Sequence, residues 1–359
     1  MASRRDFLKR ALAGSAAVAG AATCTDASAR GNAQISPDAV GLLFDSTLCI
    51  GCKACVAACK DANGLPLDYA TPIEAAWDVP VDTTARTFNV IKAYVDGSGM
   101  NKDHVQDGYA FMKSSCLHCV DPSCVSACPV SAMTKDPVTG IVGYDPDACI
   151  GCRYCVAACP FGIPKYDYDS PTGKVGKCEL CRHRMPEGKY AACAEVCPTG
   201  ATLFGKVSEL TAEAKRRLSL TPGAENTWPR GNLTTGDQPS WNGPAPAYVQ
   251  HIYGEKEVGG TQMLKLAAVP FEKLGHKPLP ERSFSSQSET LQHTLYGGLV
   301  LPLAVLGAMT WVAKRNVKHD DEDADVGRVS TRQAATEGDG RLKPALRGDS
   351  AQREGGDHE

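Results

Sequence analysis

The chain has few aromatic residues and a small net charge. Phenylalanine, tryptophan and tyrosine make up 6% of its 359 residues, and the formal net charge at pH 7 is −3. A chain without an excess of basic residues lacks the usual electrostatic attraction to nucleic acid, so we expect no such partner. It also lacks a glycine-rich nucleotide loop, a nucleophile–base pair and a histidine-rich metal motif. These absences point away from substrate chemistry.

Cysteine, by contrast, is abundant and regularly spaced. Sixteen of the 17 cysteines form four groups of four, and only Cys24 stands apart. The third group, residues 149–160, reads C-I-G-C-R-Y-C-V-A-A-C-P, which is the spacing of bacterial ferredoxins. Cysteines so close together in a tight loop suit one shared metal centre better than separate disulfides. The sixteen thiolates match the number that four [4Fe–4S] clusters need.

The four groups are related but not identical. The first, residues 49–59, nearly repeats the third, which indicates two related half-units. The second, residues 116–129, has one widened gap, and the fourth spans residues 178–198. A zinc scaffold is a rival interpretation, but a zinc knuckle needs two Cys-x-x-Cys pairs without a third cysteine three residues on.

The fourth cysteine of each group predicts how the groups pair. In two-cluster ferredoxins this cysteine binds the other cluster, so the second and third groups form one unit, and the first and fourth form another. The alternative is that each group binds its own cluster. With every position a cysteine, no iron is left open to substrate, which indicates one-electron conduction. The crossed pairing predicts these metal ligands: cluster 1, Cys49, Cys52, Cys55 and Cys197; cluster 2, Cys59, Cys178, Cys181 and Cys193; cluster 3, Cys116, Cys119, Cys124 and Cys159; cluster 4, Cys128, Cys149, Cys152 and Cys155.

The N-terminal residues 1–29 are typical of an export signal. Arg4 and Arg5 precede a mild apolar run that ends at Ala27-Ser-Ala29, as in a twin-arginine leader. Clusters must be built in the reducing cytosol, which favours a route that exports folded protein. The alternatives are an alanine-rich helix of the fold or a membrane anchor. We expect Cys24 to be removed with the leader.

The remaining residues predict an α+β fold with one anchor. We assign residues 30–205 to a domain of two interleaved ferredoxin-like units, and 206–290 to a long extended arm. Within them we expect strands at 88–95, 108–113, 141–145 and 261–269, a helix at 209–218 and a loop at 221–250. Residues 60–115 form an insertion in which we recognise no chemistry.

A second hydrophobic landmark lies near the C-terminus. The nineteen residues from Leu295 to Ala313 carry no charge and would span about 28 Å as a helix. We predict a transmembrane helix at 291–315, with a buried core helix as the alternative. Lys314 and Arg315 follow it, which predicts a cytoplasmic C-terminus and a cluster domain on the periplasmic side. Residues 316–359 are polar and predict a disordered tail.

Several charged and aromatic residues lie near the predicted ligands or the span. Lys53 and Arg153 lie between ligands and either raise cluster potentials or are simply solvated. His118 and His183 are expected to form local hydrogen bonds rather than bind iron. At the start of the span, His293 and Tyr296 are either ordinary interfacial residues, which we favour, or neighbours of a quinone or haem pocket in a partner.

These motifs resemble a known family. Residues 42–205 resemble the four-cluster ferredoxin-type subunits of molybdopterin oxidoreductases and formate dehydrogenases. The stretches Tyr253-Gly-Glu-Lys-Glu257 and Gln292-His-Thr-Leu-Tyr296 are similar to the HybA-type electron-transfer subunit of membrane-bound hydrogenase-2.

The resemblance implies a non-catalytic subunit with four [4Fe–4S] clusters. Its expected partners are the small and large subunits of a periplasmic [NiFe] hydrogenase and a multi-span, quinone-reacting membrane subunit. The alternatives are the same role in a formate dehydrogenase or a nitrite or polysulfide reductase, and a self-contained redox enzyme.

Iron and acid-labile sulfide analysis of the purified chain tests the cluster prediction. We expect about sixteen irons and a similar amount of sulfide per chain, because each of four [4Fe–4S] clusters carries four of each. Iron-free protein that carries zinc would instead identify a zinc scaffold.

Overall fold

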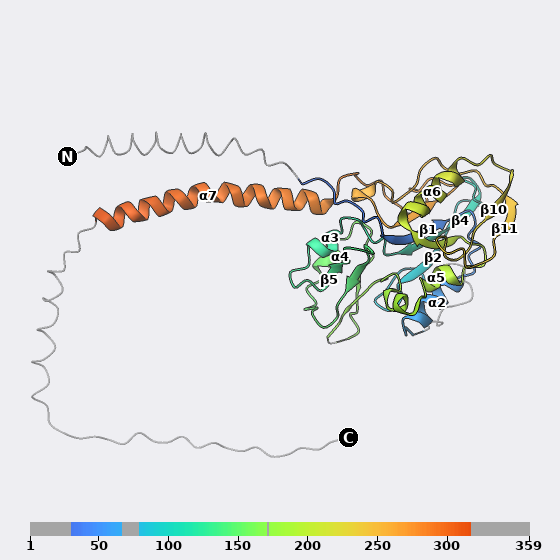
Figure 1. Ribbon diagram of the computed structural model, residues 1–359, viewed down its shortest axis with the longest axis horizontal. Coiled ribbons are helices and arrows are strands. Elements are labelled where there is room, and N and C mark those ends of the chain that lie inside the picture. Colours follow the sequence, from blue (N-terminus) through green and yellow to red (C-terminus); the bar gives the residue numbers. More distant parts are fainter. Residues whose placement is uncertain (1–29, 67–78, 171, 317–359) are drawn as a thin grey trace, which may run out of the picture. The chain divides into compact units, whose positions relative to one another are not determined.

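The computed structural model describes residues 30–66, 79–170 and 172–316 (Figure 1). Residues 30–298 belong to one compact unit, and helix α7 (Phe284–Asn316) continues from Leu299 into a second. The predicted export signal with Cys24 and the tail from residue 317 lie outside the described residues. The predicted mixture of helices and strands is confirmed among these residues.

The central sheet lies in the order β12-β1-β9. Strand β1 (Val40–Asp45) runs parallel to β12 (Met263–Leu266) and antiparallel to β9 (Thr202–Lys206). Residues 206–290 were expected to form an extended arm with a strand at 261–269. Strand β12 lies within that range and is part of the central sheet. The backbone groups along one edge of β1 would lack partners without it.

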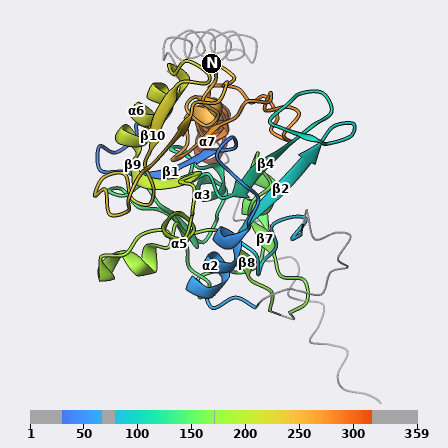
Figure 2. The same ribbon diagram turned by 90° about the vertical axis from the view of Figure 1, so that its right-hand side faces the viewer.

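Alternation along β1 separates two hydrophobic environments. Leu43 packs with Leu210 and Ala214 of α6 (Val207–Leu218), the helix that covers one face of the sheet (Figures 1 and 2). Leu42 and Phe44 point to the opposite face, where the core includes several of the predicted ligand cysteines. Because successive strand residues face opposite sides, one short strand separates the metal side of the core from its helical cover.

The insertion forms a sheet of its own, and short two-stranded sheets complete the unit. The strands predicted at 88–95 and 108–113 are present as β2 and β4, which pair in antiparallel register. Residues 221–250, predicted as a loop, instead contain two paired strands joined by a loop. The strands outside the central sheet are β2 (Asn89–Val95), β3 (Asn101–Lys102), β4 (Gly108–Ser115), β5 (Met133–Lys135), β6 (Val142–Tyr144), β7 (Lys165–Tyr166), β8 (Val175–Gly176), β10 (Glu225–Trp228) and β11 (Trp241–Pro244).

Four short helices begin within or beside the cysteine groups. Helix α2 (Ala54–Ala62) packs against α5 (Ala192–Glu195), and the two lie side by side in Figures 1 and 2. Helix α3 (Ser123–Ser126) packs against α4 (Tyr154–Ala158). The first group therefore packs against the fourth, and the second against the third. Two 3-10 helices are η2 (Arg182–Glu187) and η3 (Glu257–Gly259).

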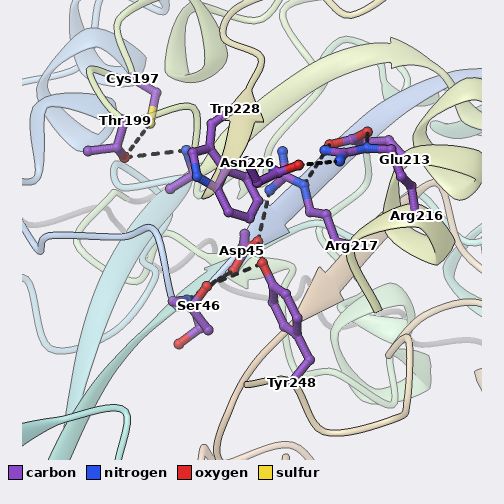
Figure 3. Close-up of polar contacts among 12 residues, drawn as sticks. Asp45, Ser46, Cys197, Thr199, Glu213, Arg216, Arg217, Asn226, Trp228 and Tyr248 are labelled. Atoms are coloured by element: carbon purple, nitrogen blue, oxygen red, sulfur yellow. Dashed lines mark hydrogen bonds and ion pairs between the residues drawn. The ribbon is translucent and has the colours of Figure 1, made fainter. Parts of the chain in front are cut away.

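A buried ionic network holds β1 against α6 (Figure 3). Arg217 Nη1 lies 2.8 Å from Asp45 Oδ2, its Nε lies 2.8 Å from Glu213 Oε1, and both Arg217 and Asp45 side chains are 0% exposed. The Tyr248 hydroxyl donates to Asp45 Oδ2 at 2.6 Å. Trp228 covers the guanidinium, whose carbon lies 5.2 Å from the ring centroid. Asp45 ends β1 four residues before the first cysteine group, so the network fixes where that group begins.

Helix α7 has 33 residues and is long and apolar enough to cross a membrane. The prediction of one C-terminal helix of this kind is confirmed among the described residues. Pro302 lies within the helix. Of its apolar side chains, Leu295, Leu303 and Trp311 are each about 60% exposed. Large apolar side chains in contact with solvent are the pattern expected of a segment that lipid or a partner covers.

Replacing Arg217 tests the importance of the buried network. Arg217→Met leaves the Asp45 carboxylate buried without its cation, which costs about 3–5 kcal/mol and lowers the thermal midpoint by on the order of 10 °C. The loss of visible cluster absorbance on heating measures this thermal midpoint. Arg216→Met is the matched control, since Arg216 is 39% exposed and its pair with Glu213 is worth about 0–1 kcal/mol. Equal losses in the two variants would contradict this account.

Candidate metal centres

Two cavities are lined by cysteines from the first and fourth groups. The first cavity lies beside Phe44 and Ile91, and its cysteines are Cys49, Cys52, Cys55 and Cys197. The second cavity lies beside Leu42 and Asn89, and its cysteines are Cys59, Cys178, Cys181 and Cys193. In each cavity the cysteines come from sequence positions more than one hundred residues apart, which the packing of α2 on α5 brings together.

The second and third groups also approach one another. Burial raises the pKa of Cys119, and the neighbouring thiolates of Cys116, Cys159 and Cys124 raise it further. Cys159 belongs to the third group, so its thiol lies among those of the second. Burial likewise raises the pKa of Cys155 to about 11, helped by Cys128, Cys149 and Cys152. Here Cys128 is the member that comes from the second group.

Tight backbone turns direct amide groups at the sulfur atoms. The amide of Gly151 donates to Cys149 Sγ with 3.4 Å between nitrogen and sulfur, and the amide of Leu180 donates to Cys178 Sγ at 3.3 Å. Gly51 has a φ of +70°, and a Cβ there would lie 2.4 Å from the Phe111 ring. Only glycine allows both that conformation and that close approach. Such N–H groups stabilise negative charge on cluster sulfur.

The donor set fits iron–sulfur clusters. All sixteen described cysteines are free thiols. Among the described residues, no three or more His, Cys, Asp or Glu side chains are close enough together to hold a single metal ion. A tetrahedral zinc ion draws its ligands in to about 2.3 Å from the metal, whereas a cube of iron and sulfide keeps its four thiolates further apart. Four-cysteine cavities of this kind would hold clusters, which supply one-electron chemistry when bound.

Two buried nitrogen donors near the cysteines have no hydrogen-bond partner among the described residues. They are Lys113 Nζ and His118 Nε2. His118 Nδ1 accepts the amide N–H of Val142 at 3.0 Å, and burial lowers the pKa of this imidazole well below its usual range. The ring is therefore neutral, with its Nε2 as the donor. His118 forms a hydrogen bond, as predicted, but its partner is 24 residues away in the sequence and is not local. Unpaired buried donors of this kind suit an anionic group.

Other residues singled out from the sequence have ordinary partners in the protein. His183 Nε2 lies 2.8 Å from the Ala62 carbonyl oxygen, so its hydrogen-bond partner comes from a distant part of the sequence and not from the neighbouring residues that we expected. Lys53 Nζ donates to the Val79 carbonyl at 2.6 Å, and the Arg153 guanidinium lies 5.4 Å from the Tyr166 ring centroid. Whether Lys53 or Arg153 adjusts cluster potentials stays a prediction. His293 and Tyr296 are exposed on α7.

Lys113 is a site residue that the sequence did not suggest. It lies in the insertion for which we predicted no chemistry, and it lines the second cavity with its side chain 0% exposed. The only sequence signal was a lysine directly after the apolar run 110–112 in the strand Gly108–Ser115. Such a lysine usually alternates to the solvent side, so its burial against cysteines required the tertiary structure.

Asp121, in the widened gap of the second group, ties this group to the start of α7. Its carboxylate accepts hydrogen bonds from Ser283 Oγ at 2.5 Å and from Arg30 Nη2 at 3.1 Å. Arg30 Nε also lies 2.6 Å from Glu289 Oε2, within the first turns of α7. The widened gap was visible in the sequence, but its role in holding the helix was not.

Comparisons with known proteins agree with this geometry. Residues 108–207 match the family described as a 4Fe-4S dicluster domain, and residues 46–64 match that described as a 4Fe-4S binding domain. The chain is 48% identical over 325 residues to the hydrogenase-2 operon protein HybA of Escherichia coli O157:H7, across 89% of this chain and 98% of that protein.

More distant relatives are subunits of another enzyme. The chain is 30% identical over 301 residues to the iron-sulfur subunit of the nitrate-inducible formate dehydrogenase of Escherichia coli strain K12, across 79% of this chain and 89% of that subunit. It is 33% identical over 223 residues to the formate dehydrogenase iron-sulfur subunit of Haemophilus influenzae, across 61% of this chain and 67% of that one. Because the likeness to HybA extends over nearly the whole of both chains, as the sequence motifs predicted, this chain belongs to the HybA family of [4Fe–4S] proteins.

Proposed function

We propose that this chain is the electron-transfer subunit of a hydrogenase-2-type complex. The observation that carries the proposal is the near full-length likeness to HybA, together with sixteen free cysteines gathered in fours. Electrons released by hydrogen oxidation in a [NiFe] partner would pass through this chain to a quinone-reacting membrane subunit. The chain's own residues hold the ligands, exclude water and supply buried charge.

The crossed ligand sets are part of this proposal. Clusters 1 and 2 would occupy the first and second cavities, and clusters 3 and 4 the two thiol sets of the second and third groups. Two features support the crossed pairing over separate groups: the cysteines that line each cavity, and the packing of α2 on α5 and of α3 on α4. One ferredoxin-like unit would then be inserted between the halves of another.

The ligands differ in their contact with solvent. Cys52 is exposed, whereas Cys55, Cys59 and Cys193 are buried. An exposed ligand brings a cluster within reach of a docked partner, and buried ligands protect the inner clusters from water. Because Cys52 and Cys55 line the same cavity, cluster 1 would reach the surface on the side of Cys52, where electrons would enter or leave the chain.

We further propose that the cluster domain lies in the periplasm and that α7 anchors it to the inner membrane. The length and apolarity of α7, with Lys314 and Arg315 in its last turn, support this orientation. Export would follow the twin-arginine route. The bonds of Asp121 and Arg30 to the start of α7 would hold the second cysteine group close to the root of the anchor.

A formate dehydrogenase is the second candidate partner, because iron–sulfur subunits of that enzyme share up to 33% identity with this chain. The electron-conducting role would be unchanged, and only the enzyme that supplies electrons would differ. The likeness to HybA is higher and covers more of both chains, which favours hydrogenase.

Affinity purification of the full chain from native membranes tests the assigned partner. We expect a nickel-containing large subunit and a small subunit to copurify, and the complex to reduce a quinone analogue with hydrogen as the electron donor. The control measures reduction of the same quinone analogue with formate in place of hydrogen as the electron donor. Copurification of a molybdopterin protein with formate-dependent reduction would contradict the hydrogenase assignment.

Cys159→Ser tests the crossed pairing. We expect this variant to perturb the cluster held by the second group, so that its electron paramagnetic resonance spectrum matches that of Cys116→Ser. Cys155→Ser is the matched control, because it removes a ligand of the third group's cluster under either pairing. If Cys159→Ser instead reproduced the spectrum of Cys155→Ser, each group would bind its own cluster.

A further inference from the structure

Lys113 is a buried cation without an anionic oxygen beside it. It lies on β4 opposite Ile91 of β2, and its side chain is 0% exposed. Among the described residues, Nζ has no oxygen or nitrogen partner, although the backbone oxygen of Lys113 accepts a hydrogen bond from Lys265. An unpaired buried ammonium group is strongly destabilising, so a neighbouring negative group must compensate it in the working protein.

Lys113 lies beside both cavities. Lys113 lines the second cavity together with Cys59, Cys178 and Cys193. Its partner across the β2–β4 pair is Ile91, which lines the first cavity together with Cys55.

We propose that Lys113 is a positioning residue that places one fixed positive charge between clusters 1 and 2 and raises both reduction potentials. This inference rests on the proposed ligand sets. The supporting geometry is its position in the wall of the second cavity and its pairing with Ile91, which lines the first cavity.

The direction of the effect follows from electrostatics. A [4Fe–4S] group with four thiolates is already anionic, and one-electron reduction adds a further negative charge to it. A buried ammonium group stabilises the more negative, reduced form more than the oxidised form, and a low local dielectric strengthens this difference. Because Lys113 lies beside both cavities, one side chain acts on two neighbouring clusters.

A second lysine, Lys135, lies near a different cysteine group and so serves as a comparison. Burial lowers the pKa of Lys135, on β5, to about 8, and the thiolates of Cys119, Cys116 and Cys124 in the second group oppose this decrease. Its Nζ donates to the Cys119 carbonyl at 2.8 Å. If buried lysines set cluster potentials locally, Lys113 and Lys135 act on different clusters of the same chain.

Redox titration of the full-length, cluster-loaded chain at pH 7, followed by electron paramagnetic resonance, tests the proposal. Dithionite serves as the reductant, so no partner subunit is needed. We expect Lys113→Met to lower the midpoint potentials of two clusters, identified with Cys55→Ser and Cys193→Ser as references, and to leave the other two unchanged. Lys113→Arg should restore both potentials, because it restores the charge.

The controls separate charge from packing. Lys113→Gln keeps a polar side chain without the charge and should reproduce the lowered potentials. If Lys113→Met loses iron, the potentials of Lys113→Gln test the inference instead. Lys135→Met should shift the second group's cluster and not the two beside Lys113. Full iron content with unchanged potentials in Lys113→Gln, or an equal shift of all four clusters, would overturn the inference. Absence of iron from the unaltered chain would instead refute the proposed function.

Discussion

The burial of negatively charged sulfur is the constraint on which the rest of this structure depends. A thiolate in an apolar core is unfavourable unless positive charge or hydrogen-bond donors surround it, and burial raises the pKa of Cys49 and Cys59 to about 12. The fold supplies the compensation from several directions. Backbone amides donate hydrogen bonds to sulfur in the turns that carry the cysteines. Lys113 contributes an ammonium group from β4, in the sheet formed by the insertion. Bound iron would supply the remainder.

A short central strand connects this metal side to the rest of the domain. One face of β1 lines the cavities through Leu42 and Phe44, and the other face packs under α6. The Arg217–Asp45 pair holds the end of β1 against α6, just before the first cysteine group. The ionic network therefore acts on the clusters indirectly, since it fixes the direction in which the chain leaves β1.

The contacts around Asp121 connect the second cysteine group to the helix that is long and apolar enough to cross a membrane. Asp121 lies in the loop that widens the second cysteine group, and its carboxylate binds Ser283 and Arg30. Ser283 directly precedes α7, and Arg30 also pairs with Glu289 in the first turns of this helix. These contacts all lie within the compact unit that ends at residue 298, so they fix the first turns of α7 relative to the second cysteine group.

The sequence by itself determined the features that depend on local spacing. Cysteine intervals predicted the cofactor class, alternation predicted β2 and β4, and an uncharged run predicted α7. Each of these signals lies within about thirty neighbouring residues, where period and composition are sufficient. The motifs also identified the HybA family, which the near full-length comparison confirmed.

Only the tertiary structure decided what depends on contacts between distant segments. It added β12 to the central sheet, although residues 206–290 have the composition of an arm. It turned Lys113 toward Cys193, eighty residues away, and joined Asp121 to Ser283. No local pattern encodes such pairs, because the chain reaches them through loop closure and packing that a linear period does not record.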